Sequence, residues 1–125
     1  MSLPPALHEL ESEIMEEVWR RGPCTVREVL DALNGRSGVQ RAYTTIMTVM
    51  HRLDGKGLLE RRRSGRHDVY APVMSREEYA RTRAGAEVGA LVDEYGDVAL
   101  AAFARHMSGL DPKRREQIRR LARRE

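Results

Sequence analysis

The sequence contains one cysteine, Cys24, among its 125 residues. A single cysteine cannot form a disulfide within the chain, and it cannot supply a cluster of thiolate ligands for a metal ion. Long apolar runs are also missing, because the longest covers residues 98–103, or 98–104 at most. A membrane-spanning helix needs about 20 such residues. The first five residues lack the basic and apolar regions of a secretion signal. We therefore expect a cytoplasmic protein with no membrane partner.

Side chains suited to catalysis or metal binding do not cluster along the chain. The four histidines are scattered, with no carboxylate or cysteine at the spacing of metal ligands. No serine or cysteine has a recognisable base arrangement, and no glycine-rich phosphate loop occurs. We expect no catalytic residue, no metal site and no cofactor. For Cys24, a passive small residue is favoured over a redox-sensitive thiol with a lowered pKa.

Charge is abundant but unevenly placed. Residues 1–40 carry four basic and seven acidic side chains, residues 41–74 carry seven and three, and residues 75–125 carry eleven and nine. Arginine outnumbers lysine by 20 to 2; codon bias can produce this preference, yet arginine also suits two-pronged contacts with phosphate and guanine. A basic middle segment after an acidic first one indicates a surface that faces a polyanion.

Two amphipathic helices are predicted in the first forty residues. The first ends at Gly22-Pro23, and its glutamates are expected to form a solvent-exposed acidic face. The second opens with Thr25 and Glu28 at the spacing of a capping box and ends at Asn34-Gly35. The apolar positions of the first helix are Leu7, Leu10, Ile14 and Val18, and its glutamates are Glu9, Glu11, Glu13, Glu16 and Glu17.

A third helix is predicted from about residue 42 to residue 56. Ile46, Val49, Met50 and Leu53 recur at helical spacing and should face the core. Gly57 suits the left-handed position that follows a helix. Residues 58–63 and 66–71 then indicate two strands around a tight Ser64-Gly65 turn. The order of three helices and a basic hairpin is typical of a winged helix-turn-helix, a mainly α fold of the α+β type.

The remaining residues predict three short helices that begin after a second capping box at Ser75 and are separated by Gly96 and Gly109. Asp111-Pro112 provides an N-cap for the last of them. These helices have too little mutual apolar surface to form a core alone. We therefore expect residues 7–72 to be a DNA-binding winged-helix domain and residues 75–125 to be a helical dimerisation tail.

The third helix and the hairpin hold the candidate binding residues. An uncharged helix face is expected at Thr44, Met47, Thr48 and His51, where hydroxyl, methyl and imidazole groups suit base edges in a major groove. Arg41 and Arg52 flank this face and suit backbone phosphates. The hairpin is expected to concentrate four more cations at one tip, where they would strengthen binding without reading much sequence: Arg61, Arg62, Arg63 and Arg66. Tyr70 is expected to pack in the core, with a phosphate bond as the less favoured alternative.

Several segments resemble the penicillinase repressor family of the BlaI, MecI and CopY type. The resemblance covers residues 7–72 strongly and the tail in architecture only. Its most specific part is residues 42–58, which include the run Ala-Tyr-Thr-Thr-Ile-Met-Thr-Val. The other matching segments are Leu10-Glu11 through Trp19, Thr25-Val26-Arg27-Glu28-Val29, and Val69-Tyr70-Ala71-Pro72.

The resemblance implies a homodimeric winged-helix repressor that binds a palindromic double-stranded DNA operator and exchanges helical tails. It places Arg52 near the DNA backbone and Arg62 and Arg63 in the wing. It also places five residues at recognition-helix positions: Tyr43, Thr44, Thr45, Met47 and Thr48.

This chain departs from the family pattern at two points. It has no cysteine-rich metal motif, so metal sensing is not carried over. Ala102 precedes Phe103 where penicillinase-type members are cleaved between asparagine and phenylalanine, so that cleavage and a β-lactam signal are not carried over either. The residues and the resemblance together predict a sequence-specific repressor, while a winged-helix module that binds a protein partner is the alternative. A small hydrolase has almost no support, because no acid, base and nucleophile converge.

Overall fold

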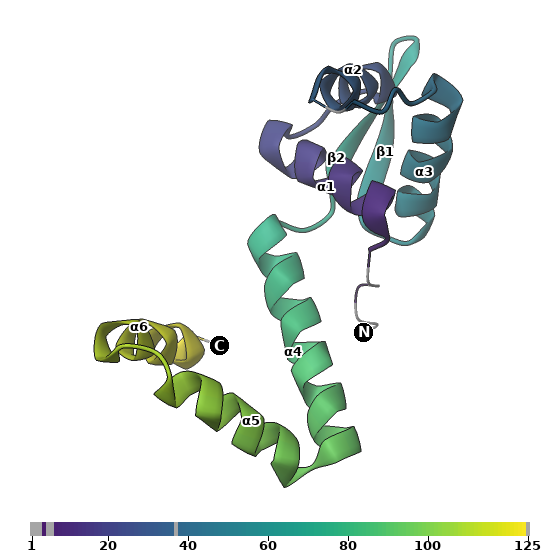
Figure 1. Cartoon of the computed structure of the whole chain (residues 1–125). Helices are drawn as coiled ribbons and strands as arrows, with labels where there is room; N and C mark the ends of the chain where they lie inside the picture. The colour runs from purple at the N-terminus through teal and green to yellow at the C-terminus, as the bar shows by residue number, and fades with distance from the viewer. Residues whose placement is uncertain (1–3, 5–6, 37, 125) are drawn as a thin grey trace. The chain divides into compact units, whose positions relative to one another are not determined.

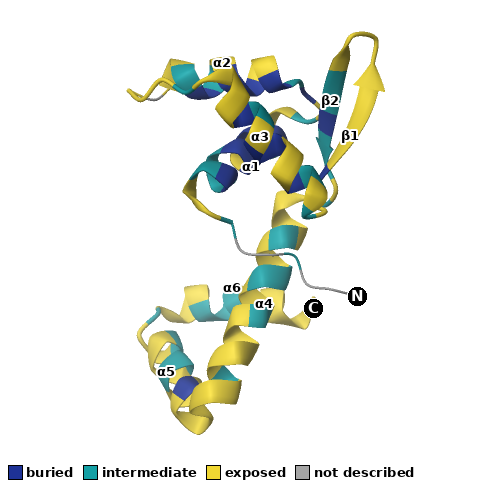
Figure 2. Ribbon diagram, turned by 90° about the vertical axis from the view of Figure 1, so that its right-hand side faces the viewer, coloured by how far each residue is buried: buried dark blue, intermediate teal, exposed yellow. Residues whose placement is uncertain are grey.

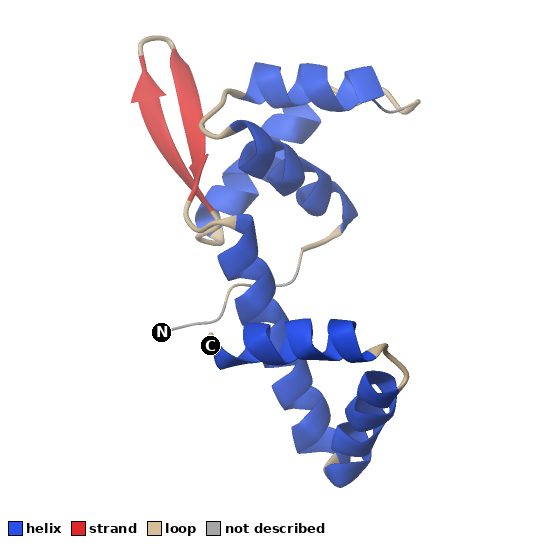
Figure 3. Ribbon diagram, turned by 90° about the vertical axis from the view of Figure 1, so that its left-hand side faces the viewer, coloured by secondary structure: helices blue, strands red, loops and turns tan. Residues whose placement is uncertain are grey.

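The computed structural model describes residue 4, residues 7–36 and residues 38–124 (Figure 1). Its first part holds α1 (Glu9–Arg21), α2 (Val26–Arg36), α3 (Tyr43–Gly55), β1 (Leu59–Ser64) and β2 (His67–Pro72). Its last part holds α4 (Arg76–Tyr95), α5 (Asp97–Ser108) and α6 (Pro112–Arg123). Figure 3 shows the order that the sequence predicts, in which helices precede and follow a single hairpin.

Local sequence signals set the ends of α2 and α3. At the start of α2, the Thr25 hydroxyl accepts a hydrogen bond from the Glu28 amide at 3.2 Å, and the Glu28 carboxylate accepts one from the Thr25 amide at 2.9 Å. This is the predicted capping box. After α3, Gly57 has a φ of +80°, which side chains with a Cβ rarely adopt. Both helix boundaries are therefore confirmed to within one or two residues.

The hairpin differs from the prediction by one residue. β1 and β2 pair antiparallel, with Leu59 opposite Pro72 and Ser64 opposite His67. The two turn residues are therefore Gly65 and Arg66, not Ser64 and Gly65. Gly65 has a φ of +62°, and the first central position of a two-residue hairpin turn requires a positive φ. The glycine fixes that position and moves the whole turn by one residue.

A single apolar core joins α1, α2, α3 and the hairpin, and Figure 2 shows the buried faces of these elements turned toward one another. The predicted apolar positions of α3 are all buried. Tyr70, at the middle of β2, is fully buried as well, so its interpretation as a core residue is confirmed and a phosphate contact is excluded. The core side chains are Ile14, Met15, Val18, Cys24, Val26, Val29, Leu30, Leu33, Ile46, Val49, Met50, Leu53, Leu58, Leu59 and Tyr70.

The prediction that the five glutamates of α1 form a solvent-exposed face is wrong for two of them. Glu11 is 2% exposed and Glu17 is 1% exposed. Glu11 accepts a hydrogen bond from Lys56, which follows α3, at 2.7 Å. Glu17 accepts hydrogen bonds at 2.6 to 2.9 Å from three guanidinium groups: Arg20, Arg21 and Arg36. A buried carboxylate requires such partners, and two of these cations lie too far along the sequence for the local pattern to reveal them.

The three arginines around Glu17 change its titration. Burial alone would raise the pKa of this carboxyl, but hydrogen bonds from Arg20, Arg36 and Arg21 outweigh burial and lower the pKa from 4.5 to about 2. Because the folded value lies below the unfolded one, Glu17 stabilises the fold above about pH 4.5, and this stabilisation is lost as the pH falls toward about 2.

The variant Glu17→Gln is therefore expected to be less stable than the wild type near neutral pH by about 2 kcal/mol. This free energy is smaller than the pKa shift alone would give, because solvent around the arginines screens the ion pairs. The difference should shrink as the pH falls to about 2. Urea unfolding followed by Trp19 fluorescence measures it. The exposed Glu9, changed to Gln, serves as the control. A deficit that stays constant over the whole range would show that the ion pairs do not stabilise the fold.

The helices after the hairpin follow the predicted pattern. The Ser75 hydroxyl accepts a hydrogen bond from the Glu78 amide at 3.0 Å, and the Asp111 carboxylate accepts one from the Arg114 amide at 2.9 Å. The chain divides into two compact units within α4, after Ala84. Of the described residues from 75 onward, only Ala99 is buried. No helix in the described part of the chain is long and apolar enough to cross a membrane.

Candidate nucleic-acid interface

The two faces of α3 have opposite characters. Its core face is buried, as described above, whereas most of the predicted binding residues are exposed. Met47 differs from them, because it is half-buried and packs against the core. The exposed residues of this helix are Tyr43, Thr44, Thr45, Thr48, His51, Arg52 and the C-terminal Gly55. Arg52, near one end, is the one arginine, lysine, aspartate or glutamate among these exposed residues.

The N-terminal half of α3 is held in place by the end of α2. Asn34 accepts a hydrogen bond from the Arg41 amide at 2.8 Å and donates one to the Arg41 carbonyl at 3.1 Å. The Gln40 side chain donates a third hydrogen bond, to the Asn34 carbonyl, at 3.0 Å. These bonds fix where the connection ends and α3 begins. The orientation of the exposed face of α3 relative to α2 is thus set by the fold.

The four hairpin arginines do not share one surface. Neighbouring residues on a strand point to opposite faces, so Arg61 and Arg63 lie on one side of β1 and Arg62 on the other. Arg62 is 79% exposed and Arg63 is 68% exposed, while Arg61 is 42% exposed. Arg63 contacts Asp68 at 3.4 Å, and Arg66 occupies the turn. The four cations are therefore divided between the two faces of β1 and the turn, whereas the sequence predicted that they gather at one tip.

A hollow of about 360 Å³ lies between α3, the beginning of α2 and the hairpin. It brings together five predicted residues from α3 and the hairpin: Tyr43, Met47, His51, Arg63 and Arg66. The other lining residues are Thr25, Val26, Arg27, His67, Asp68 and Tyr70. Its cations outnumber its one carboxylate, so the hollow favours an anion.

Arg27 is a residue of this hollow that the sequence analysis missed. It lies in the first turn of α2, and its guanidinium carbon is 5.1 Å from the centre of the Tyr43 ring. This cation–π contact holds the arginine over the start of α3. The signal available in the sequence was its place two residues after the Thr25 cap, where a cation lies close to the amides at the start of a helix.

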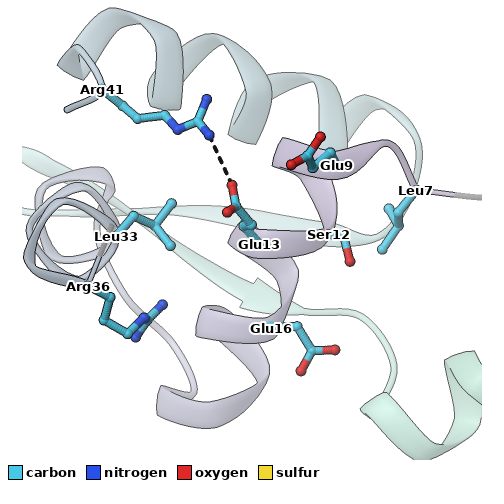
Figure 4. Close-up of a pocket in the computed structure, with 8 residues that line it drawn as sticks. All are labelled: Leu7, Glu9, Ser12, Glu13, Glu16, Leu33, Arg36 and Arg41. Atoms are coloured by element: carbon cyan, nitrogen blue, oxygen red, sulfur yellow. Dashed lines mark hydrogen bonds and ion pairs between the residues drawn. The ribbon is translucent and has the colours of Figure 1, made fainter. Parts of the chain in front are cut away.

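Arg41 does not line this hollow. It lines a different hollow, of about 750 Å³, which is formed mainly by α1 and the end of α2 (Figure 4). Its guanidinium contacts the Glu13 carboxylate at 3.2 Å, the one interaction drawn between the residues of that view. Glu9 and Glu16 also line this hollow, as does Arg36, so that it holds three carboxylates and two guanidinium groups. A carboxylate-rich hollow is unfavourable for a phosphate.

Cys24 pairs with the hairpin through its backbone, and its thiol is buried. Its amide donates to the Tyr70 carbonyl at 2.9 Å and its carbonyl accepts from the Tyr70 amide at 2.8 Å, so the two residues form an isolated bridge. The side chain is buried, and burial raises the pKa of the thiol to about 11. The alternative of a lowered pKa is therefore wrong, because the environment is apolar. Among the described residues, no group of three or more histidine, cysteine, aspartate or glutamate side chains is suited to hold a metal ion.

Two solved structures share this arrangement of helices and hairpin. One is the solution structure of the DNA-binding domain of the repressor BlaI, which has a TM-score of 0.54 and 30% identity. The other is the solution structure of the Bacillus licheniformis BlaI monomeric form in complex with the blaP half-operator, which has a TM-score of 0.52 and 30% identity. Each match covers 63% of this chain and 94% of the other. The fold is thus a winged helix-turn-helix, as predicted.

The chain belongs to the penicillinase repressor family, whose model matches residues 7–124. It is 45% identical over 73 residues to the transcriptional regulator BlaI of Mycobacterium tuberculosis, a match that covers 58% of this chain and 51% of that protein. It is 31% identical over 75 residues to the penicillinase repressor of Bacillus licheniformis, covering 60% and 57%. The matched segment thus spans about half the length of these relatives. The resemblance found in the sequence is confirmed at the level of the family.

Proposed function

We propose that this chain is a sequence-specific transcriptional repressor that acts in the cytoplasm as a homodimer on a palindromic DNA operator. The observation that carries the proposal is an uncharged, threonine-bearing helix face beside an arginine-rich hairpin, with a cationic hollow between them. Helix-turn-helix proteins read bases with such a helix in the major groove and bind phosphates on both sides of it. The operator complex of the related BlaI supports the same assignment.

The helix α3 is proposed to read base edges. Thr44 and Thr48 are both exposed and lie one turn apart, so their side chains share a face. A threonine offers a hydroxyl to a base and a methyl group to thymine. Tyr43, Thr45 and Met47 complete the proposed reading surface, although the half-buried Met47 presents only part of its side chain.

Phosphate contacts are proposed on both sides of α3. Arg62, Arg63 and Arg66 would bind the backbone from the hairpin, and Arg52 would bind it from the far end of the helix. Arg27 and the amides at the start of α2 add a contact that the sequence analysis did not include. Arg41 is left out of the proposed surface, because Glu13 already pairs with it in a carboxylate-rich hollow.

The tail is proposed to form the dimer. Val88, Leu91 and Tyr95 of α4 are 41 to 55% exposed and recur at helical spacing on one face. Further exposed apolar side chains on the two following helices are Val98, Leu100 and Leu121. This much exposed apolar surface in a short helical segment is unfavourable in water. A second copy of the tail would cover it, and two winged helices would then meet the two halves of a palindrome.

Changing Thr44 and Thr48 to Val tests base reading directly. The change keeps the shape and removes the hydroxyl, so preference among duplexes is expected to shift by about tenfold while affinity for random DNA is kept. The preferred duplex is first selected from a randomised pool with the wild-type chain, and the variants are then compared by gel shift. Thr82→Val on α4 is the matched control.

Two outcomes would count against the proposal. An equal loss of affinity for all duplexes would show that these threonines do not read bases. Absence of salt-sensitive binding to any duplex would overturn the DNA-binding function itself and would favour a winged-helix module that binds a protein. Selection from the pool separates these cases before any variant is made, because a module of that kind enriches no duplex.

A further inference from the structure

Arg61 lies within reach of acceptors from two different elements. Its Nη1 atom is 3.1 Å from Nε2 of His51 on α3. The same guanidinium lies 3.8 Å from a carboxylate oxygen of Asp54 on α3 and 3.9 Å from one of Asp68 on β2. The adjacent Arg62 contacts Glu60, two residues earlier on β1, at 3.6 Å and is 79% exposed. Arg61 therefore connects the hairpin to α3, whereas Arg62 extends into solvent.

The contact between Arg61 and His51 has a defined direction. An arginine side chain has only donors, so Nε2 of His51 is the acceptor, in the tautomer that places the ring proton on Nδ1. Its ring also lies 6.1 Å from the ring of Tyr70, which is fully buried in the core. The Arg61–His51 contact thus rests on a fixed part of the protein.

We propose that Arg61 is a positioning residue, which holds the hairpin against α3 through His51 and leaves the phosphate contacts to the other hairpin arginines. This inference rests on the proposed DNA-binding function and assigns a different role to two residues of the predicted surface. A duplex meets α3 and the hairpin at the same time. The angle between them therefore decides whether threonines face bases while Arg62 and Arg63 reach phosphates.

The experiment compares Arg61→Ala with Arg62→Ala in the full chain. Binding to the duplex selected from a randomised pool and to a random duplex of equal length is measured over a range of salt. Arg62→Ala is expected to weaken both affinities and to lower the salt slope by about one. Arg61→Ala is expected to keep the slope for random DNA and to lower the preference for the selected duplex about tenfold.

A second variant, Arg61→Lys, separates charge from geometry. Lysine keeps the cation but lacks the planar fork that contacts acceptors on two elements. Its preference for the selected duplex is expected to fall as in Arg61→Ala, with an unchanged salt slope. Thermal unfolding of each variant shows whether it is folded at the assay temperature. A lower slope for random DNA with either folded variant at Arg61 would overturn the assignment, because it would make Arg61 a phosphate contact.

If the wild-type chain selects no duplex from the randomised pool at all, the proposed function itself has failed.

Discussion

A chain carrying Leu91→Glu and Val98→Glu is expected to be monomeric and to bind a palindromic duplex about a hundredfold more weakly than the wild type. Both side chains are exposed in the single chain, at 42% and 70%. A glutamate therefore costs little in the monomer but would be buried without a partner in a dimer. Because the second winged helix would no longer be held near its half-site, affinity for the palindrome should fall to that for one half-site.

Sedimentation equilibrium measures the association of the tails, and gel shifts with a palindrome and a half-site measure its effect on binding. Arg105→Glu on α5 introduces the same charge at an exposed position that is already charged, and it should leave the dimer intact. A double variant that remains dimeric would show that these side chains lie outside the dimer interface. A monomer that binds the palindrome with full affinity would show that the two half-sites are not bound together.

Replacing Arg62 and Arg63 by alanine is expected to lower the slope of log K against log salt by about 1.8, since each phosphate contact contributes about 0.9. Relative to about 1 M salt, where the electrostatic part vanishes, this corresponds to about thirtyfold weaker binding at about 0.15 M. The loss should be similar for selected and random duplexes, because phosphates carry no sequence information. Fluorescence anisotropy with both duplexes over a range of salt provides the measurement.

Arg76→Ala is the matched control for this change, because Arg76 is 66% exposed and pairs with Glu16 outside the proposed surface. It should leave the slope unchanged. Equal slopes for the hairpin double variant and the wild type would remove the hairpin from the interface. A loss confined to the selected duplex would instead show that these arginines read bases.

The elements of this fold were predictable from short-range signals. The apolar spacing of α3, the capping box of α2 and the glycine after α3 act within a few residues, so the sequence contains them in full. The same holds for the Ser75 and Asp111 caps of the later helices. Where the prediction was off by one residue, in the hairpin turn, the positive φ of Gly65 was the deciding local fact.

The roles of individual charged residues were not predictable in this way. Glu17 looked like part of a solvated face, but Arg36, 19 residues away, helps to make it a buried ion-pair centre. Arg41 was predicted to contact a phosphate from its place before α3, and nothing in the sequence indicated that it pairs with Glu13, 28 residues away. Arg61 and Arg62 are neighbours with the same side chain, and only one of them reaches back to α3.

By itself, the sequence determined the placement of net charge, the order of the helices and strands, and the strand boundaries to within one residue, because periodicity, caps and composition are properties of local segments. The family also followed from the sequence, since its most specific pattern lies within residues 42–58. Tertiary structure decided which charged groups are occupied by partners inside the protein and which face outward. Arginine and glutamate are long, flexible side chains whose energies depend on whatever group lies within a few ångströms. Folding alone brings together partners that are distant along the chain.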